Sequence, residues 1–346
     1  MKRSTTWLLT AGVLLFTCEI VSHSVPAVYA TLAVAGWGLL LVTLFHLVPL
    51  AVDAAAIRVL LPARSSWRDT LLARWAGESA SSLLPFGQLA GPVVMIRQLW
   101  RRGVSTQNAV AAVTVSTTLQ VLAQIAFALL GVVLIAGQVS PRAQDAFRPA
   151  LLLAAIALAL PAVAFYLLQR RGLFAWSMRA ISRVSTRRDW SALHARAQAI
   201  DQAVQTTYQH GGRAPASFLL NLAGWIAGTG EVYLLLRLFG APVTWGIALM
   251  LESVGQAVRG AAFAIPGALG VQEGGYLLLA PLAGLHPDTA LALSLAKRAR
   301  EILLGVPGLL QLHASESLGR GHPPAGTGER TERPCSGWDG SSDPRS

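Results

Sequence analysis

Ionisable and amide side chains recur inside the apolar stretches of this 346-residue sequence. Glu252, Gln256 and Arg259 are spaced i, i+4 and i+7, and Lys297 and Glu301 are spaced i and i+4, so each set shares one helix face. Charges at membrane depth cost at least about 2.5–3.5 kcal/mol each and usually face a bundle interior. The spacing predicts a polar cavity for an amphiphile's head group, with cations attracting phosphate or hydroxyl oxygens and carboxylates balancing the charge.

The candidate substrate-binding or pathway residues gather at two interrupted apolar segments and on the stretches beside them. They are Glu78, Ser79, Pro85, Gly87, Gly91, Arg97, Gln120, Gln124, Glu252, Gln256, Arg259, Pro266, Gly267, Gly270, Gln272, Glu273, Lys297, Arg298, Arg300 and Glu301. The alternative is that they form internal salt bridges and amide bonds that hold the bundle together. Glu19, Asp53 and Glu231 are more isolated, and we interpret them as structural or interfacial. We interpret His46 as a packed or hydrogen-bonded histidine.

Catalytic and metal-binding patterns are missing from the sequence. No GxSxG, HExxH, GxGxxG or P-loop motif occurs, and the seven histidines are scattered. Cys18 lies in an apolar run and Cys335 in a polar one, with no CxxC pair. We therefore expect no enzyme activity, no cofactor and no metal.

The composition is that of a membrane protein. Hydrophobic residues make up 53% of the chain and charged residues only 13%, against about 25% in an average soluble domain. The net charge is +11, but the basic residues lie between apolar runs, in 58–74, 97–102 and 170–213. That pattern is typical of cytoplasmic loops on anionic lipid and does not favour nucleic-acid binding.

The hydropathy pattern predicts an all-α polytopic protein with about six full spans. They cover Trp7–Val21, Ala27–Leu50 continuing as helix to Leu61, Asn108–Gly137, Ala150–Gln169, Pro215–Phe239 and Thr289–Leu312, although residues 244–312 can be divided in more than one way. Lys2 and Arg3 favour a cytoplasmic N-terminus and an uncleaved first span, with a cleavable signal peptide as the alternative.

The sequence predicts one transmembrane domain, residues 1–312, and a polar tail after it. Within the domain, residues 170–213 are typical of a basic amphipathic segment at the cytoplasmic interface, or alternatively of a solvated loop with some helix. Residues 313–346 are polar and rich in Gly, Pro, Ser and Arg, so we expect a disordered C-terminal tail.

Two apolar segments are interrupted by proline followed by glycine. Each opens with a Glu-Ser pair (Glu78, Glu252) and breaks at a proline (Pro85, Pro266). The helical pieces beside the prolines are expected to be about ten residues long, too short to cross about 30 Å at 1.5 Å per residue. Free backbone groups in hydrocarbon need protein or a water-filled cavity around them. The pair predicts two re-entrant helix–break–helix elements of opposite orientation, as in inverted repeats with a binding site at the midplane.

At these residues the sequence resembles a known family. Glu252-Ser-Val-Gly-Gln-Ala-Val-Arg259, Ala264-Ile-Pro-Gly-Ala-Leu-Gly-Val-Gln-Glu-Gly-Gly275 and the block from Leu293 to Gly305 are similar to the HpnL family of hopanoid biosynthesis-associated membrane proteins. That family belongs to the flippase-like superfamily typified by the transmembrane half of lysylphosphatidylglycerol synthase. Glu78-Ser-Ala-Ser-Ser-Leu-Leu-Pro85 and residues 118–124 are similar to its first half, and the resemblance covers about residues 5–312.

The resemblance implies an inner-membrane protein without a catalytic domain that moves or places hopanoids. Its implied partners are membrane lipids, hopanoid and anionic phospholipid among them, and hopanoid biosynthesis enzymes. Superfamily members often carry Gly-Gly followed by an acidic residue after the first break. This sequence reads Ala90-Gly91-Pro92 there, which puts a carboxylate role at that place in doubt.

The sequence leaves two rival functions open. One is an integral-membrane lipid-modifying enzyme with Glu78, Glu252 or Glu273 as general base. The other is a non-transporting scaffold for hopanoid biosynthesis enzymes that docks them on residues 170–213. For a lipid translocase, a proton gradient and downhill movement are both compatible with the absence of a nucleotide motif.

Overall fold

The structure, a computed structural model, describes residues 25–63, 65–84, 87–136, 156, 159–160, 162–184, 191–262, 265 and 268–318. Every secondary-structure element in those ranges is a helix, which confirms the all-α prediction. Three helical stretches there are long and apolar enough to cross a membrane: Gly38–Leu60, Thr106–Leu134 and Arg213–Leu238. The predicted first span lies outside the described residues, and so do nine of the twenty residues of the fourth, whose other eleven are helical.

The predicted second span is divided into three helices. They are α2 (Val25–Ala35), α3 (Gly38–Phe45) and α4 (Leu47–Leu60). Gly36 has a φ of +46°, a left-handed conformation that glycine adopts without steric cost. The prediction of one helix from Ala27 to Leu61 is therefore wrong at Gly36, and only α3 with α4 forms the spanning stretch.

Two other spans are confirmed within two residues of their predicted ends, α7 (Thr106–Ala136) and α11 (Arg213–Leu238). The last helix, α14 (Pro287–Leu318), continues past the predicted end at Leu312 and takes in the first six residues of the predicted tail. The rest of that tail, residues 319–346, lies outside the described ranges.

Both interrupted segments form two helices each. The first is α5 (Trp67–Leu83) and α6 (Gly87–Arg101), and the second is α12 (Trp245–Ala261) and α13 (Val271–Leu279). Three of these pieces exceed the expected ten residues, but α5 and α12, with 17 residues each, reach only about 25 Å. The breaking residues Pro85, Pro266 and Gly267 lie outside the described ranges, and the inverted repeat stays a prediction.

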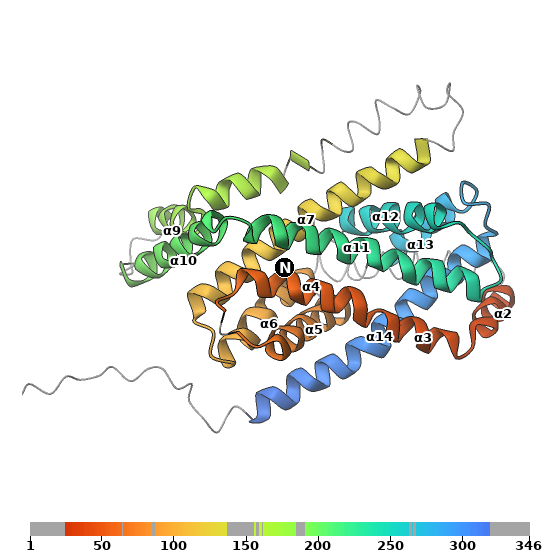
Figure 1. Ribbon diagram of the computed structural model, residues 1–346, viewed down its shortest axis with the longest axis horizontal. Coiled ribbons are helices and arrows are strands. Elements are labelled where there is room, and N and C mark those ends of the chain that lie inside the picture. Colours follow the sequence, from red (N-terminus) through yellow and green to blue (C-terminus); the bar gives the residue numbers. More distant parts are fainter. Residues whose placement is uncertain are drawn as a thin grey trace, which may run out of the picture.

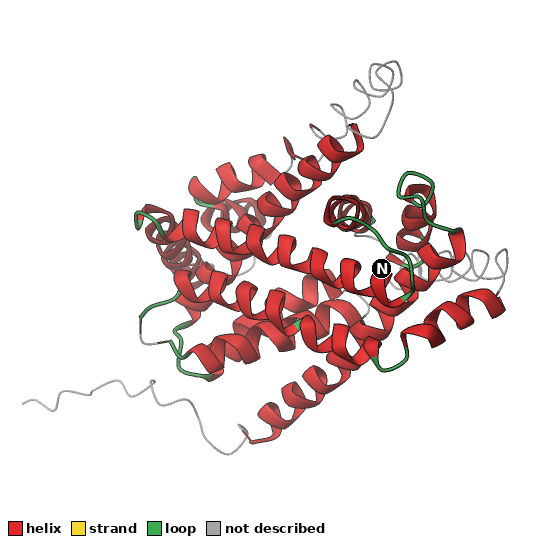
Figure 2. Ribbon diagram, turned by 45° about the vertical axis from the view of Figure 1, so that its right-hand side comes forward, coloured by secondary structure: helices red, strands yellow, loops and turns green. Residues whose placement is uncertain are grey.

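Helices from both halves of the chain pack side by side. The helices α4 and α11 lie together across the bundle, α7 packs against α6, α11 and α12, and α14 packs against both α5 and α13 (Figure 1). Figure 2 shows the same bundle from a second direction as helices joined by short loops. The two interrupted elements therefore share α7 and α14 as neighbours.

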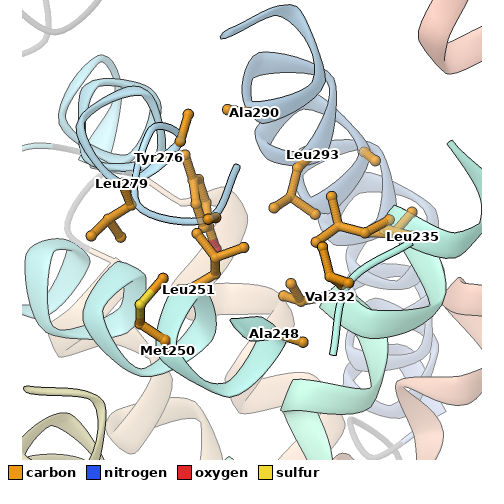
Figure 3. Packing of buried hydrophobic residues seen from close by; sticks show 14 of the residues in the cluster. Val232, Leu235, Ala248, Met250, Leu251, Tyr276, Leu279, Ala290 and Leu293 are labelled. Carbon is orange, nitrogen blue, oxygen red and sulfur yellow. The ribbon is translucent and has the colours of Figure 1, made fainter. Parts of the chain in front are cut away.

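The apolar core fills the space between the C-terminal helices. Val232 and Leu235 of α11, Leu251 of α12, Tyr276 of α13 and Leu293 of α14 are all buried there, and their side chains converge in Figure 3. Burial of such side chains contributes about 1.5–3 kcal/mol each. This core fixes the relative positions of α11, α12 and α14, and the last two carry many of the charged residues singled out in the sequence.

The helices α5 and α6 touch through their backbones. A Cβ atom on Gly91 would lie 2.0 Å from Ser81 Oγ and 2.8 Å from the Gly77 carbonyl oxygen. Only a glycine fits at such a contact, so the sequence-predicted site residue Gly91 has a packing role here.

Residues 173–209 contain two further helices, α9 (Leu173–Val184) and α10 (Ser191–Gln209). The Asp201 carboxylate of α10 accepts hydrogen bonds from the backbone N–H groups of Phe174 (3.0 Å) and Ala175 (2.7 Å) at the start of α9. Tyr208 donates to Gln169 (2.9 Å), whose amide donates to Thr118 of α7 (2.7 Å). The segment is therefore largely helical and attached to the bundle.

Candidate functional site

Two adjoining cavities lie inside the bundle, with volumes of about 370 Å³ and about 160 Å³. Helices α5, α7, α11 and α12 contribute side chains to both, and α4 and α14 add theirs to the smaller one. The residues that line both cavities are Arg74, Glu78, Gln120, Trp225, Gln256 and Arg259. Because they share these six residues, the cavities adjoin one another, and we treat them together as one candidate site.

The larger cavity combines amide and apolar walls. Gln124 of α7 donates to the backbone carbonyl of Gln256 (2.9 Å), and the Trp225 indole donates to the carbonyl of Gln120 (3.4 Å). The side chains of Val121, Ile125 and Ala128 line the same space. Groups of both kinds on one wall suit an amphiphilic ligand, which has polar and apolar parts.

Ion pairs line the smaller cavity. Arg74 of α5 contacts the Asp53 carboxylate of α4 at 2.6 Å. Lys297 of α14 donates to Glu252 of α12, and a further pair joins Arg259 to Glu301 across the same two helices. Buried charges are stable only when paired and hydrogen-bonded. Each of these six charged groups is therefore paired with an opposite charge inside the bundle.

His46, at the junction of α3 and α4, lies between carboxylates from two other helices. Its Nε2 lies 2.6 Å from Glu78 Oε1 of α5, and its Nδ1 contacts Glu231 of α11. The Arg300 guanidinium of α14 also lies within hydrogen-bond distance of both ring nitrogens. One imidazole thus joins four helices of the site.

The polar residues lie midway along the spanning helices. Gln120 is halfway along Thr106–Leu134, and Trp225 is halfway along Arg213–Leu238. His46 and Asp53 lie on either side of the centre of Gly38–Leu60. The cavities are therefore at the depth at which hydrocarbon would otherwise surround these side chains.

The family of the lysylphosphatidylglycerol synthase TM region matches residues 6–308 of this sequence. The chain belongs to this family. No curated protein and no solved structure matches the chain. The match includes all the residues that line the two cavities, so the cavities are part of the TM region. It confirms the resemblance at the level of the superfamily and identifies a lipid-related membrane protein.

The TM region brings nine of the twenty sequence-predicted residues to the cavity walls. They are Glu78, Gln120, Gln124, Glu252, Gln256, Arg259, Lys297, Arg300 and Glu301. The i, i+4 and i+7 spacing on α12 and the i, i+4 spacing on α14 direct these side chains to the same cavity. Their salt bridges also match the structural alternative, because the same contacts join helices.

A second polar group in the TM region surrounds the start of α13 and is joined to the cavities by Arg259, which donates a hydrogen bond to Gln272 (3.3 Å). Glu273 accepts hydrogen bonds from the Gly270 N–H (2.9 Å), from Ser294 (2.9 Å) and from Arg298 (2.6 Å), and Gln272 donates to Ser294 (3.0 Å). The residues of this group are not among those that line the two cavities. It fixes the start of α13, where Gly270 has a φ of +78°.

The remaining predicted residues lie away from the two cavities or outside the described ranges. Ser79 donates to the Trp75 carbonyl (2.8 Å), and Arg97 is exposed on α6. Gly87 is the first residue of α6, and Gly91 forms the α5–α6 contact. Pro85, Pro266 and Gly267 lie outside the described residues.

The predicted set of site residues omits four ionisable residues that line the smaller cavity: His46, Asp53, Arg74 and Glu231. Asp53 and Glu231 are not isolated, because each pairs with a cation from another helix, and these pairs agree with the structural interpretation of both residues. The positions of these charges in the sequence could have indicated their pairing. An unpaired charge near the middle of an apolar span is costly, so each needs a partner elsewhere in the sequence.

The described residues contain no group of three or more His, Cys, Asp or Glu side chains arranged to hold a metal ion.

Proposed function

We propose that this chain is a lipid translocase of the bacterial inner membrane, with a cytoplasmic N-terminus, that moves hopanoid lipids and catalyses no reaction. Membership of the lysylphosphatidylglycerol synthase TM region family supports a lipid-related membrane role. The observation that carries the proposal is the pair of adjoining polar cavities midway along the spanning helices.

A polar head group crosses hydrocarbon only if protein groups replace its hydrogen bonds to water. The amides of Gln120, Gln124 and Gln256 can donate to and accept from hydroxyl groups. The neighbouring ion pairs are already formed, so little reorganisation is needed when a head group arrives.

The larger cavity has an exposed apolar residue in its α7 wall. Val121 lines that cavity, and its side chain is 41% exposed on α7. A lipid can therefore keep its apolar part against the outside of α7 while its head group enters. A hopanoid is a rigid apolar polycycle with a polar tail, so its polycycle can lie outside α7 while its tail lies in the cavity.

The test in cells compares the hopanoid content of inner and outer membranes with and without the gene. A changed distribution at unchanged total supports transport, and altered hopanoid species support the enzyme. A Gln120→Ala/Gln124→Ala variant should show the same changed hopanoid distribution as cells without the gene. Gln107→Ala, on the exposed start of the same helix, should keep the normal distribution. Loss of function on removal of residues 170–213, with a normal Gln120→Ala/Gln124→Ala variant, would support the scaffold instead.

The test in vitro uses the purified full chain in lipid vesicles that contain labelled polyhydroxylated hopanoid in one leaflet. The proposal expects the label to reach the other leaflet faster than in protein-free vesicles. Equal rates in both preparations would overturn it.

A further inference from the structure

His46 has more polar partners than a single protonation state can satisfy. Glu78 and Glu231 are both acceptors, and each faces a different ring nitrogen. A neutral imidazole carries one N–H, so only the imidazolium can donate to both carboxylates. The imidazolium has no lone pair left for Arg300, whose Nη1 lies 2.5 Å from Nδ1 and 2.8 Å from Nε2.

Two sets of contacts therefore exclude one another. With the proton bound, the ring joins Glu78 to Glu231. With the proton lost, one nitrogen accepts a hydrogen bond from Arg300 and the other donates to a single carboxylate. Arg300 is suited to this exchange because its Nε, 3.4 Å from Glu231 Oε2, makes no hydrogen bond to the described part of the chain.

The charges around the smaller cavity balance only when His46 is protonated. Its described walls carry the five carboxylates Asp53, Glu78, Glu231, Glu252 and Glu301 and the four cations Arg74, Arg259, Lys297 and Arg300. These are also the charged groups that surround His46 from α4, α5, α11, α12 and α14. Since an unbalanced charge is costly at membrane depth, loss of the proton favours the arrival of a new hydrogen-bond donor or positive group.

Glu78 is the carboxylate that a ligand can reach. Its side chain is 26% exposed and lines both cavities, whereas that of Glu231 is 3% exposed and lines only the smaller one. A donor in the larger cavity can therefore replace His46 at Glu78 while Glu231 keeps its contact with the ring.

We propose that His46 exchanges a proton for a head group that donates hydrogen bonds through hydroxyl or ammonium groups. When Nε2 loses its proton, the N–H electron pair returns to the ring and the proton passes to water. Glu78 then accepts a hydrogen bond from the head group, and Arg300 donates to the ring. The exchange rests on the proposed translocation and makes it proton-coupled, with proton and head group bound alternately.

The first test observes His46 without any transport. Imidazole nitrogen NMR of histidine-labelled protein in liposomes, assigned with His46→Gln, should show a change from two N–H groups to one as the pH rises. At a fixed pH within that change, Glu78→Gln should lower the doubly protonated fraction and Arg300→Gln should raise it. A single protonation state throughout, or an unchanged fraction in both variants, would overturn the proposal.

The second test measures coupling in vesicles with an imposed pH gradient and a labelled lipid. The probes are a polyhydroxylated hopanoid, phosphatidylethanolamine with its ammonium group, and phosphatidylcholine, which has no N–H donor. The gradient should accelerate translocation of either donor lipid, or of both, but not of phosphatidylcholine, and the lipid that responds identifies the donor group.

The matched control is His286→Gln, which removes a histidine paired with Asp288 (3.1 Å) whose side chain is 74% exposed. His46→Gln should lose the gradient effect and His286→Gln should keep it. Translocation that ignores the gradient in the unmodified protein would overturn proton coupling and leave the translocase standing. Absence of translocation for every lipid would overturn the translocase and, with it, the exchange that rests on it, whereas the NMR result would still show whether His46 changes its protonation state.

Discussion

Lys297 of α14 donates a hydrogen bond to Glu252 of α12, and the two side chains are only 2% and 4% exposed. Gln256 donates to the second oxygen of the same carboxylate at 2.8 Å. Pairs of this kind are costly to break, because removal of one partner leaves a buried charge.

Lys297→Met should lower the free energy of unfolding by about 3–5 kcal/mol, since Glu252 then remains buried without its cation. Unfolding of the purified protein in mixed micelles measures the change. The double variant Lys297→Met/Glu252→Leu should be more stable than the single one, because neither charge remains. Equal stability of the unmodified protein and Lys297→Met would contradict the pairing.

Gly91→Val should loosen the α5–α6 hairpin. Its side chain would overlap Ser81 and the Gly77 carbonyl, and overpacking of this kind costs about 1–3 kcal/mol. Thermal unfolding in detergent should show a lower unfolding temperature for Gly91→Val than for the unmodified protein. Gly211→Ala is the control, because nothing lies within 4 Å of a Cβ there. A Gly91→Val protein as stable as Gly211→Ala would show that α5 and α6 do not touch at this place.

The sequence predicts helices better than it predicts the partners of their charges. Hydropathy alone locates α7 and α11, because a run of about 20 apolar residues has few alternatives in a membrane protein. Hydropathy does not predict the turn at Gly36, because a glycine in an apolar run does not reveal whether its φ is positive. Hydropathy also does not predict the length of α5, because polar residues before Glu78 continue the helix without an apolar signal.

Local spacing predicts a shared face but not a partner on another helix. Glu252 and Gln256 are one turn apart, and the structure joins them directly. Asp53 and Arg74 are 21 positions apart, and only the packing of α4 against α5 brings them together. His46 shows the same limit, because its neighbours come from positions 78, 231 and 300.

Asp201→Ala should release α9 from α10. The Asp201 carboxylate accepts from the first N–H groups of α9, and loss of such a cap costs about 0.5–2 kcal/mol. Hydrogen exchange of residues 173–178 should become faster. Asp201→Asn keeps one acceptor oxygen and should show a smaller effect. Unchanged exchange in Asp201→Ala would mean that other contacts hold α9.

Ala257→Trp should block the larger cavity. Ala257 of α12 lines a space of about 370 Å³, which has room for an indole ring, so the variant should fold. The ring would occupy the place proposed for the head group and face Gln120 and Gln124. Translocation of labelled hopanoid in vesicles should fall to the protein-free rate, while thermal unfolding stays close to that of the unmodified protein. Val133→Trp adds the same ring on the outside of α7, where the side chain is 65% exposed, and should leave translocation unchanged. If Ala257→Trp moved lipid at the normal rate, the head group would have to cross by a route other than this cavity.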